Sequence, residues 1–487
     1  MDTIPAMAIT FTAVRSVPKT AKARVRIVTT DAVEEGISGV SDAQLAQAGF
    51  SGKAGETFVV HADARSEALV GIGSVDEVDT KAVRTAGAAI GKGFARHGRI
   101  GVELPSVELD GAAMRQALVE GIAGATYSFI TYKSKGKATT LKTVAVAGGS
   151  GAKNQAALDR GSVLARGQML ARDFVNEPGG TLTPAVFARR TAAMAKQQGL
   201  SVKVWDEAAI KKGKLGGLLG VNRGSDNPPR LVELTYTPAT KPAGTVAFVG
   251  KGITFDAGGL SIKTGAGMMT MKDDMGGAAA VIGAMSVLKE LGVSCRVRAF
   301  IPMTDNMLGG DATRPGDVLT YRNGKTIEVL NTDAEGRLIL ADALCLASEA
   351  KPDAIIDLAT LTGACMVALG PKIAGLMGNN DDWIAQIEAS SAATSERVWH
   401  LPLPPEYRKH VDSNVADMKN IGIAHGGALT AGLILQEFVA DGIPWAHLDI
   451  AGPAWTESED AEITKGGTGF GVRLLADLAA NFSTPAS

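Results

Sequence analysis

A regular alternation of short apolar runs with longer helical stretches constrains this chain of 487 residues more than any other feature of its sequence. Between residues 244 and 303, the β-type run "GTVAFVG" precedes a glycine-rich loop, the helical stretch "GGAAAVIGAMSVLKELG" follows, and "SCRVRAFIPM" is typical of a second strand. Strands that alternate with helices predict an α/β fold. Each loop from strand to helix then lies at a carboxyl strand end, where open α/β sheets form their ligand sites.

The alternation occurs in two parts of different size. In the first third, β-type runs such as "ARVRIVTT" and "LKTVAVAG" alternate with helical stretches such as "GAAMRQALVEGIAGATY". A glycine-rich stretch at 148–151 then gives way to a long helical pattern, which Pro178 and two glycines end. We predict a smaller N-terminal α/β domain at 1–152, a connecting helix at 153–176, and a larger C-terminal α/β domain at 177–487 with a mixed, mainly parallel sheet.

The composition is that of a globular protein without an obvious polyanionic partner. Lys and Arg number 49 against 51 Asp and Glu, which argues against nucleic acid and anionic membranes as partners. The three cysteines show no CxxC spacing, so neither a disulfide framework nor a thiolate zinc site is indicated. No run of about 18 apolar residues occurs, and the N-terminus lacks the pattern of a secretory signal. We therefore expect a cytoplasmic protein that does not span a membrane.

The stretch "DVLTYRNGKTIEVL" predicts a hairpin in the second half of the chain. Its turn falls at Asn323-Gly324, a dipeptide that accepts positive φ at both turn positions. Beyond it, "LILADALCLASEA" has the apolar spacing of a helix, and "DAIIDLATLTG" is typical of a strand. The polar segment 331–337 therefore lies between a hairpin and a helix.

Two loops at strand ends carry an unusual concentration of acids and amines. They supply four carboxylates and two amines: Lys251, Asp256, Lys263 and Asp274 from the loop at 250–274, and Asp333 and Glu335 from "NTDAEGRLILADAL". Oxygen-rich groups without histidine suit Mg²⁺ or Mn²⁺, and carboxylates also bind Zn²⁺. A shared carboxylate is the usual way to hold two ions about 3.5 Å apart.

The spacing of Asp333 and Glu335 adds a condition. Residues at i and i+2 point apart on a helix but to one side of an extended segment, so both can ligate only if the helix begins at about Arg337. The helix N-terminus would then present amides and a positive dipole beside Arg337, which favours a small bound anion.

Each of these residues also has a structural interpretation. "TDAEGR" is a common helix start, in which Thr332 or Asp333 caps and Glu335 complements the dipole. Asp256 can stabilise a turn, and Asp274 can cap a helix that begins at about Met275. Lys251 and Lys263 can be solvated surface amines. These interpretations leave unexplained why four carboxylates and two lysines gather in the strand-end loops of one domain.

With these residues, the sequence closely resembles the leucyl aminopeptidase family, the cytosolic M17 metallopeptidases. "NTDAEGRL" at 331–338 matches the family's signature octapeptide, and "GKGITFDAGGLSIK" with "MKDDMGGAAAV" matches its other metal segments. "NEPGGTLTP", "DLATLTGA" and "PWAHLDIAGPAW" are similar as well. The clear match covers roughly 172–475, whereas the N-terminal third is similar only in its α/β alternation.

The resemblance implies a site with two divalent ions, Mn²⁺ or Zn²⁺. The first ion would be held by four residues: Lys251, Asp256, Asp274 and Glu335. Asp256, Asp333 and Glu335 would hold the second, and Lys263 and Arg337 would be the catalytic pair outside the metal shell. The resemblance also implies a homohexamer built as a dimer of trimers.

We hypothesise a leucyl aminopeptidase that releases N-terminal Leu and other bulky apolar residues from peptides through a hydroxide that bridges the two ions. Lys263 would stabilise the oxyanion as a cation, whereas Lys251 would have to stay neutral beside the ions. Bicarbonate at Arg337 is the expected proton carrier, as in the family. For the substrate side chain we expect a pocket at Met271, Thr360 and Gly363.

Three other functions fit parts of the pattern. A different two-metal hydrolase, such as a phosphoesterase, would use the same ligands. A DNA-binding regulator is a second class, against which the near-neutral charge argues. A catalytically inactive relative is a third, against which the complete set of matching ligand positions argues.

Overall fold

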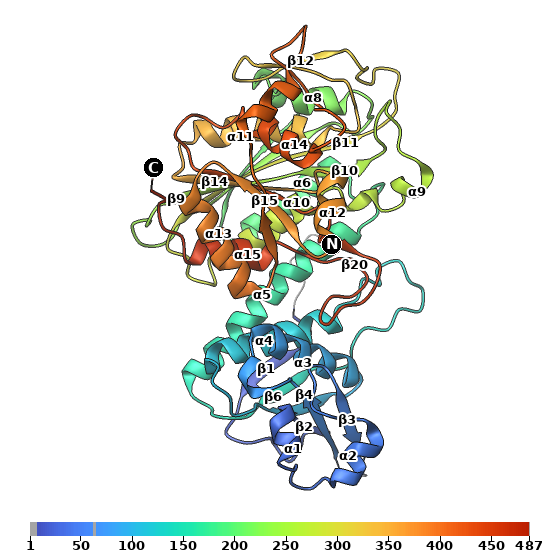
Figure 1. The fold of residues 1–487 in the computed structure, drawn as a ribbon, viewed down its shortest axis with the longest axis vertical. Helices are drawn as coiled ribbons and strands as arrows, with labels where there is room; N and C mark the ends of the chain where they lie inside the picture. The colour runs from blue at the N-terminus through green and yellow to red at the C-terminus, as the bar shows by residue number, and fades with distance from the viewer. Residues whose placement is uncertain (1–6, 62–64, 487) are drawn as a thin grey trace. The chain divides into compact units, whose positions relative to one another are not determined.

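The computed structural model describes residues 7–61 and 65–486, and in it the chain forms two compact units (Figure 1). Of the described residues, the smaller unit contains those up to Met169 together with Glu457–Lys465, and the larger contains Leu170–Thr456 and those from Gly466 onward. The unit boundary falls inside helix α5 (Ala152–Asn176), so the domain limits predicted from the sequence stay a prediction. Among the helices of the described residues, none combines the length and apolar content needed to cross a bilayer.

The smaller unit is built around a six-stranded sheet with strand order β1-β6-β5-β2-β4-β3. All neighbouring strands are parallel except β3 and β4. Its strands are β1 (Thr10–Ala13), β2 (Ala23–Val28), β3 (Thr57–Val60), β4 (Ser66–Gly71), β5 (Arg99–Glu103) and β6 (Thr143–Val146). Its helices before α5 are α1 (Thr30–Glu34), α2 (Asp42–Ala48), η1 (Val75–Glu77), α3 (Thr80–Gly93) and α4 (Gly111–Thr126).

The larger unit contains a nine-stranded mixed sheet, which confirms the predicted mixed and mainly parallel architecture. Its order is β16-β15-β18-β14-β9-β11-β8-β7, with β10 paired to β11. The central strands β18, β14, β9, β11 and β10 run parallel, and β15, β8 and β7 join antiparallel neighbours. The strands are β7 (Ser201–Trp205), β8 (Arg230–Tyr236), β9 (Thr245–Gly250), β10 (Gly252–Asp256), β11 (Arg296–Asn306), β14 (Ala354–Ala359), β15 (Ala374–Gly378), β16 (Val398–His400) and β18 (Trp445–Asp449).

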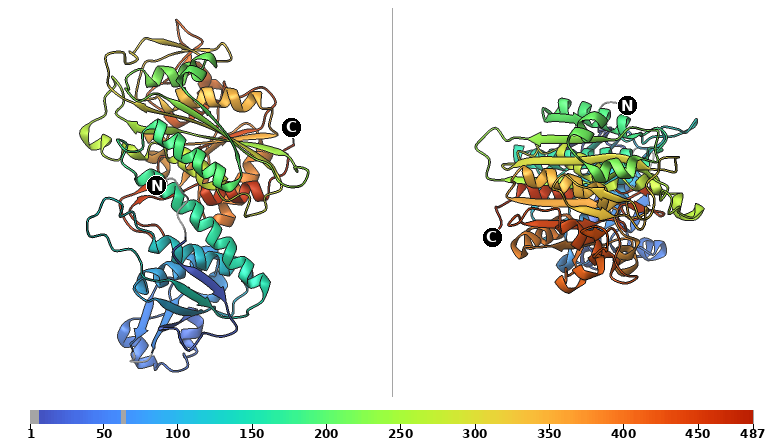
Figure 2. Two further views of the ribbon diagram at one scale, coloured as in Figure 1. Left: turned by 180° about the vertical axis from the view of Figure 1, so that it is seen from behind. Right: turned by 90° about the horizontal axis from the view of Figure 1, so that it is seen from above.

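Helices cover both faces of this sheet (Figures 1 and 2). One buried cluster packs α6, α10, α13 and α15 on one face, and a second packs α8, α11 and α14 on the other. The helices are α6 (Pro184–Gln198), α7 (Glu207–Lys212), α8 (Gly216–Asn222), α9 (Gly265–Met268), η2 (Met271–Asp273), α10 (Gly276–Met285), α11 (Gly336–Glu349), α12 (Gly363–Leu369), α13 (Asp381–Thr394), η3 (Pro405–Val411), α14 (Gly427–Gln436) and α15 (Val472–Ala480). A sheet covered on both faces explains why its central strands are almost wholly buried.

The predicted hairpin is present, but its turn differs from the prediction. Strands β12 (Val318–Thr320) and β13 (Thr326–Glu328) pair antiparallel, and β13 also pairs with β17 (Met418–Lys419). Of the two turn residues only Gly324 has positive φ, at 89°. Asn323 instead accepts a hydrogen bond from the Lys325 N–H through its side-chain oxygen (3.1 Å). This local bond stabilises the turn without the strain of positive φ at Asn323. The remaining short pair is β19 (Trp455–Thr456) and β20 (Gly466–Gly467).

Candidate active site

The carboxyl ends of the parallel strands bring the first group of polar residues together. Lys251 directly follows β9, Asp256 is the last residue of β10, and Asn306 is the last residue of β11. Thr360 directly follows β14, and Asp449 ends β18. Because these strands are parallel neighbours, their polar ends meet at one edge of the sheet, as open α/β sheets require for a ligand site.

Asp333 and Glu335 lie in a turn, not in the extended segment that their spacing suggested. The Ala334 N–H donates to the Asn331 carbonyl (3.2 Å), and Glu335 already has helical dihedral angles before α11 begins at Gly336. The extended prediction was wrong because this main-chain bond closes the segment into a turn.

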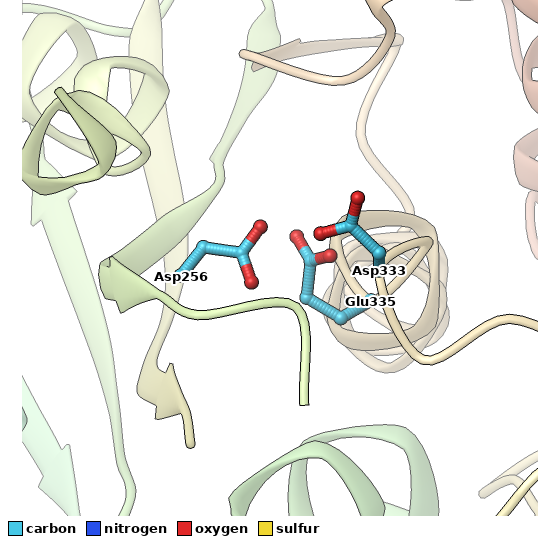
Figure 3. A group of neighbouring side chains, drawn as sticks. All are labelled: Asp256, Asp333 and Glu335. Atoms are coloured by element: carbon cyan, nitrogen blue, oxygen red, sulfur yellow. The ribbon is translucent and has the colours of Figure 1, made fainter. Parts of the chain in front are cut away.

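Three carboxylates converge despite the turn. Oxygen atoms of Asp256, Asp333 and Glu335 lie within 4.8 Å of one another. Figure 3 shows Asp256 at the end of its strand, facing the two acids that precede α11. The Asn306 side-chain amide (2.8 Å) and the Gly258 N–H (2.8 Å) both donate to Asp256 Oδ1, which fixes the orientation of this carboxylate.

Lys251 joins the remaining predicted acid to this group. Its Nζ lies 2.6 Å from Asp274 Oδ1 and 2.9 Å from Glu335 Oε1, and it donates to the Thr360 carbonyl (2.7 Å). Burial lowers the pKa of Lys251, but the carboxylates of Asp274, Glu335 and Asp256 outweigh burial and raise it above its usual value. A Cβ atom on Gly336 would approach Lys251 Nζ to 2.8 Å, so the amine needs a glycine at the start of α11.

Lys263 contacts the other side of the acid group. Its Nζ lies 2.8 Å from Asp256 Oδ2 and 2.6 Å from Asp333 Oδ1. Burial lowers the pKa of Lys263, and the Asp256 carboxylate, followed by Asp333, raises it above the ordinary lysine value. Lys263 is therefore a cation at neutral pH, close to the acids but less buried than Lys251.

The donor set fits divalent metal ions. Burial, followed by the charge of neighbouring carboxylates, holds the pKa values of Asp274 and Glu335 above their usual range. The four carboxylates outnumber the two amines, and dications relieve the repulsion that remains. Asp274 Oδ2 is buried without a hydrogen-bond partner among the described residues, and such an oxygen is available as a ligand.

Arg337 lies at the first turn of α11, with its guanidinium almost completely buried. Its Nη1 donates to the Asn420 carbonyl (3.0 Å), and its Nε is buried without a partner among the described residues. Burial lowers the pKa of Arg337 to about 10, although Glu335 and Asp449 oppose that shift. The guanidinium stays charged at neutral pH and retains unused N–H donors, as an anion site requires.

The three residues predicted to form a substrate pocket lie around the same strand ends. Met271 begins η2 and is half-buried, and Gly363 is the exposed first residue of α12. The Thr360 hydroxyl donates to Asp274 Oδ1 (2.7 Å) in addition to the carbonyl contact with Lys251. Thr360 is thus part of the acid and amine network, and the pocket itself stays a prediction.

Sequence reasoning missed several residues that shape the site. Asn306 and Asp449 both end apolar strands, in "RVRAFIPMTDN" and "WAHLD", and a polar residue at such an end was the signal available. Asp449 Oδ2 accepts from the Thr362 hydroxyl (2.6 Å) and so fixes the loop that follows Thr360. Asn420 carried no comparable signal, because it follows only the two-residue strand β17.

Comparison with known proteins agrees with this geometry. Residues 169–476 match the catalytic domain of the cytosol aminopeptidase family, and residues 17–136 match its N-terminal domain. Proteins named "Probable cytosol aminopeptidase" are similar throughout. The one from Trichormus variabilis is 42% identical, covering 91% of this chain and 92% of its own. That from Streptomyces avermitilis is 43% identical, covering 95% and 93%.

Solved structures are also similar to this chain in sequence and fold. The bottromycin maturation enzyme BotP in complex with Mn is 36% identical, with a TM-score of 0.88 over 95% of this chain and 99% of that one. A mutant of tomato leucine aminopeptidase is 32% identical, with a TM-score of 0.90 over 97% of each chain. By domain matches, identity and fold, this chain belongs to the cytosol aminopeptidase family and is a metal-dependent aminopeptidase that acts on peptides.

Proposed function

We propose that this chain is a two-metal leucyl aminopeptidase that releases N-terminal Leu and other bulky apolar residues from peptides. The convergence of Asp256, Asp333 and Glu335 within 4.8 Å carries the proposal. The likeness to a tomato protein whose name includes leucine aminopeptidase supports the preference for Leu.

Two overlapping sets of residues would hold the metals. The first set is Lys251, Asp256, Asp274 and Glu335, and the second is Asp256, Asp333 and Glu335. The shared carboxylates keep two ions close, and Mn²⁺ or Zn²⁺ suits the oxygen-rich set. The Mn complex of the similar enzyme BotP supports Mn²⁺. When bound, the ions would lower the pKa of the attacking water and draw electrons from the scissile carbonyl.

The catalytic work of the chain itself would fall to Lys263 and Arg337. Lys263, a cation held between Asp256 and Asp333, would donate to the oxygen of the scissile carbonyl and stabilise the developing oxyanion. Arg337 would bind bicarbonate through its unused N–H donors, and this anion would carry a proton from water to the leaving amine. Burial of Arg337 supports this role, because a charge–charge contact is stronger away from solvent.

The substrate side chain would lie against Met271, Thr360 and Gly363. Thr360 supports this placement, because it touches both Asp274 and Lys251 and so lies beside the proposed metals. At Gly363 a Cβ atom would meet no other part of the described chain within 4 Å, so there is room for a side chain at this position. We expect a larger residue there to narrow the range of accepted substrates.

Hydrolysis of amino-acid anilides tests the function directly. With Mn²⁺ or Zn²⁺ present, leucine anilide should be cleaved faster than the alanine, lysine and glutamate anilides. Exhaustive chelation should abolish cleavage, and added metal should restore it. Full activity without metal, or a preference for a charged anilide, would contradict the proposal.

The division of roles between metal ligands and Lys263 has its own test. Lys263→Ala should lower kcat by about 100-fold while the metal content stays near normal, since an oxyanion donor contributes about that much. Asp256→Ala should lose bound metal, because this carboxylate serves both ions. Metal analysis of both purified variants decides the point, and equal metal loss in the two would refute the assignment.

We further propose a homohexamer in the cytoplasm, with domain limits at 1–152, 153–176 and 177–487. The names of the relatives support the cytoplasmic location. Sedimentation velocity should give one species of six chains at micromolar concentration. A monomer that is fully active would overturn the assembly proposal without affecting the chemistry.

A further inference from the structure

Asn420 is a completely buried residue that none of the proposed roles uses. It directly follows β17, and its main-chain N–H donates to the Glu328 carbonyl at the end of β13 (2.9 Å). This bond extends the pairing of β17 with β13 by one residue and brings Asn420 beside the segment that leads to the acids.

The side chain of Asn420 binds the turn at 330–334 through both the oxygen and the nitrogen of its amide. Oδ1 accepts hydrogen bonds from the Leu330 N–H (2.9 Å) and the Asn331 N–H (3.3 Å). Nδ2 donates to the Asn331 carbonyl (2.6 Å) and the Ala334 carbonyl (3.3 Å). Only an amide of this size can accept from two N–H groups and donate to two carbonyls at once, whereas a carboxylate has no donor.

The main-chain carbonyl of Asn420 holds Arg337, because it accepts the hydrogen bond from Arg337 Nη1 (3.0 Å). One residue therefore contacts both the turn that carries Asp333 and the side chain of Arg337. Its bonds fix the position of the carboxylates relative to the guanidinium.

Helix α11 begins without a side-chain cap. Glu335 occupies the N-cap position but makes no side-chain capping bond, and the bond from the Asp333 N–H to the Asn331 side-chain oxygen (2.9 Å) fixes only the turn, not its position relative to Arg337. We propose that Asn420 is a positioning residue of the active site, which holds Asp333, Glu335 and Arg337 in register. This inference rests on the proposed function, because it takes those three residues as the groups that bind metal and the catalytic anion.

Replacement by the isosteric acid is the sharpest change. Asn420→Asp keeps the shape and the acceptor, loses the donor, and places a negative oxygen against two carbonyls. We expect kcat for leucine anilide to fall by about 10- to 100-fold, the effect of misplacing catalytic groups by about 1 Å, with a smaller change in KM. Should this variant fail to fold, Asn420→Ser, which keeps one hydroxyl, carries the same expectation.

Asn379, which is exposed whereas Asn420 is buried, offers a control for the exchange of amide for acid. Its side chain also joins two main-chain groups, donating to the Ile443 carbonyl (3.1 Å) and accepting from the Trp445 N–H (2.7 Å), but at the amino end of β18, away from the acids. Asn379→Asp should leave kcat unchanged. Equal losses in Asn379→Asp and Asn420→Asp would show a general packing effect and overturn the inference.

A double-mutant cycle with Arg337→Ala separates positioning from mere stability. Because Asn420 acts through the guanidinium, Arg337→Ala should lower kcat much less in the Asn420→Asp background than in the wild type. If the fall in kcat of the double variant equals the product of the falls in the two single variants, the coupling is refuted. Failure of the wild type to cleave leucine anilide would count against the proposed function itself. An Asn420→Asp variant with the same kcat as an active wild type would count against this inference alone.

Discussion

Lys251 needs two protonation states for the proposed chemistry. Among the carboxylates of Asp274, Glu335 and Asp256 its pKa lies above the usual value, so without metal the amine carries a proton at neutral pH. A metal ligand must be the free amine. Metal uptake therefore displaces at least one proton, and the apparent metal affinity should rise by about tenfold per pH unit for each proton released. Competition titrations between pH 6.5 and 8.5 measure this slope.

Two lysine variants identify the source of that proton. Lys251→Met has no proton to release and should lower the slope by about one, whereas Lys263→Met should leave it unchanged. Lys263 is a suitable control because it also contacts two of the acids and also has a raised pKa. A wild-type slope in Lys251→Met would mean that the carboxylates alone release the protons.

The sequence indicated the charged residues of the candidate site, but not the residues that hold them in position. Lys251, Asp256 and Lys263 were singled out because charged residues in a glycine-rich strand-end loop have few structural reasons to cluster, and the fold brings all three together. Asn420 and Asn306 were not predicted. Their bonds reach residues tens of positions away in the chain, and a lone buried asparagine leaves no periodic pattern that would indicate such partners.

Helix α8 shows how one element is stabilised by another. Its N-cap residue Leu215 has no side-chain acceptor, yet Asp342 of α11 accepts from the Leu218 N–H (2.7 Å) and also bonds to the Gly217 N–H. Asp342 is fully buried, and burial raises its pKa well above the usual value, although the two N–H donors oppose the shift. The carboxyl group thus replaces a local cap.

Removal of the Asp342 carboxyl group should lower the stability of the protein. Asp342→Ala leaves buried N–H groups without partners and should lower the free energy of unfolding by about 1–3 kcal/mol. Asp342→Asn keeps one acceptor oxygen and should lose less. Asp206 provides the comparison, because it caps α7 from its own N-cap position (2.8 Å to the Ala209 N–H), near solvent. Denaturant titrations in which Asp206→Ala costs as much as Asp342→Ala would contradict the distinction.

Helices and strands were predictable where the local sequence had one clear hydrophobic pattern. The strand at 245–250 is an apolar run after Thr245, the strand at 354–359 is apolar except for Asp357, and both form central strands. The prediction of an extended segment at 331–335 was wrong, because two acids at i and i+2 indicate such a segment only if nothing else bends the chain. The bond from the Ala334 N–H to the Asn331 carbonyl bends it, and Asn420 stabilises that bend from another element.

For the whole molecule, the site is a meeting point of segments that span about 200 residues. Residues from Lys251 to Asp449 reach it from the ends of different strands, and four carboxylates gather there, of which all but that of Asp333 are buried. The repulsion among them opposes folding of the metal-free protein. A ligand that binds only the folded chain stabilises it by about 2.7 kcal/mol at 100 times its Kd. Metal should therefore contribute to the stability of the larger unit as a whole.

Thermal unfolding of chelated and Mn²⁺-loaded protein, at one scan rate and one protein concentration, measures this contribution. We expect the loaded protein to unfold at a higher temperature, and the difference to grow with the logarithm of free Mn²⁺. Asp256→Asn preserves the size of the side chain but removes a shared ligand, so it should lose most of the shift. Asp311→Asn changes an exposed acid that pairs with Arg223, and should keep the full shift. The same shift in both variants would place the stabilising metal elsewhere, because only the first change alters a carboxylate in the group formed by Asp256, Asp333 and Glu335.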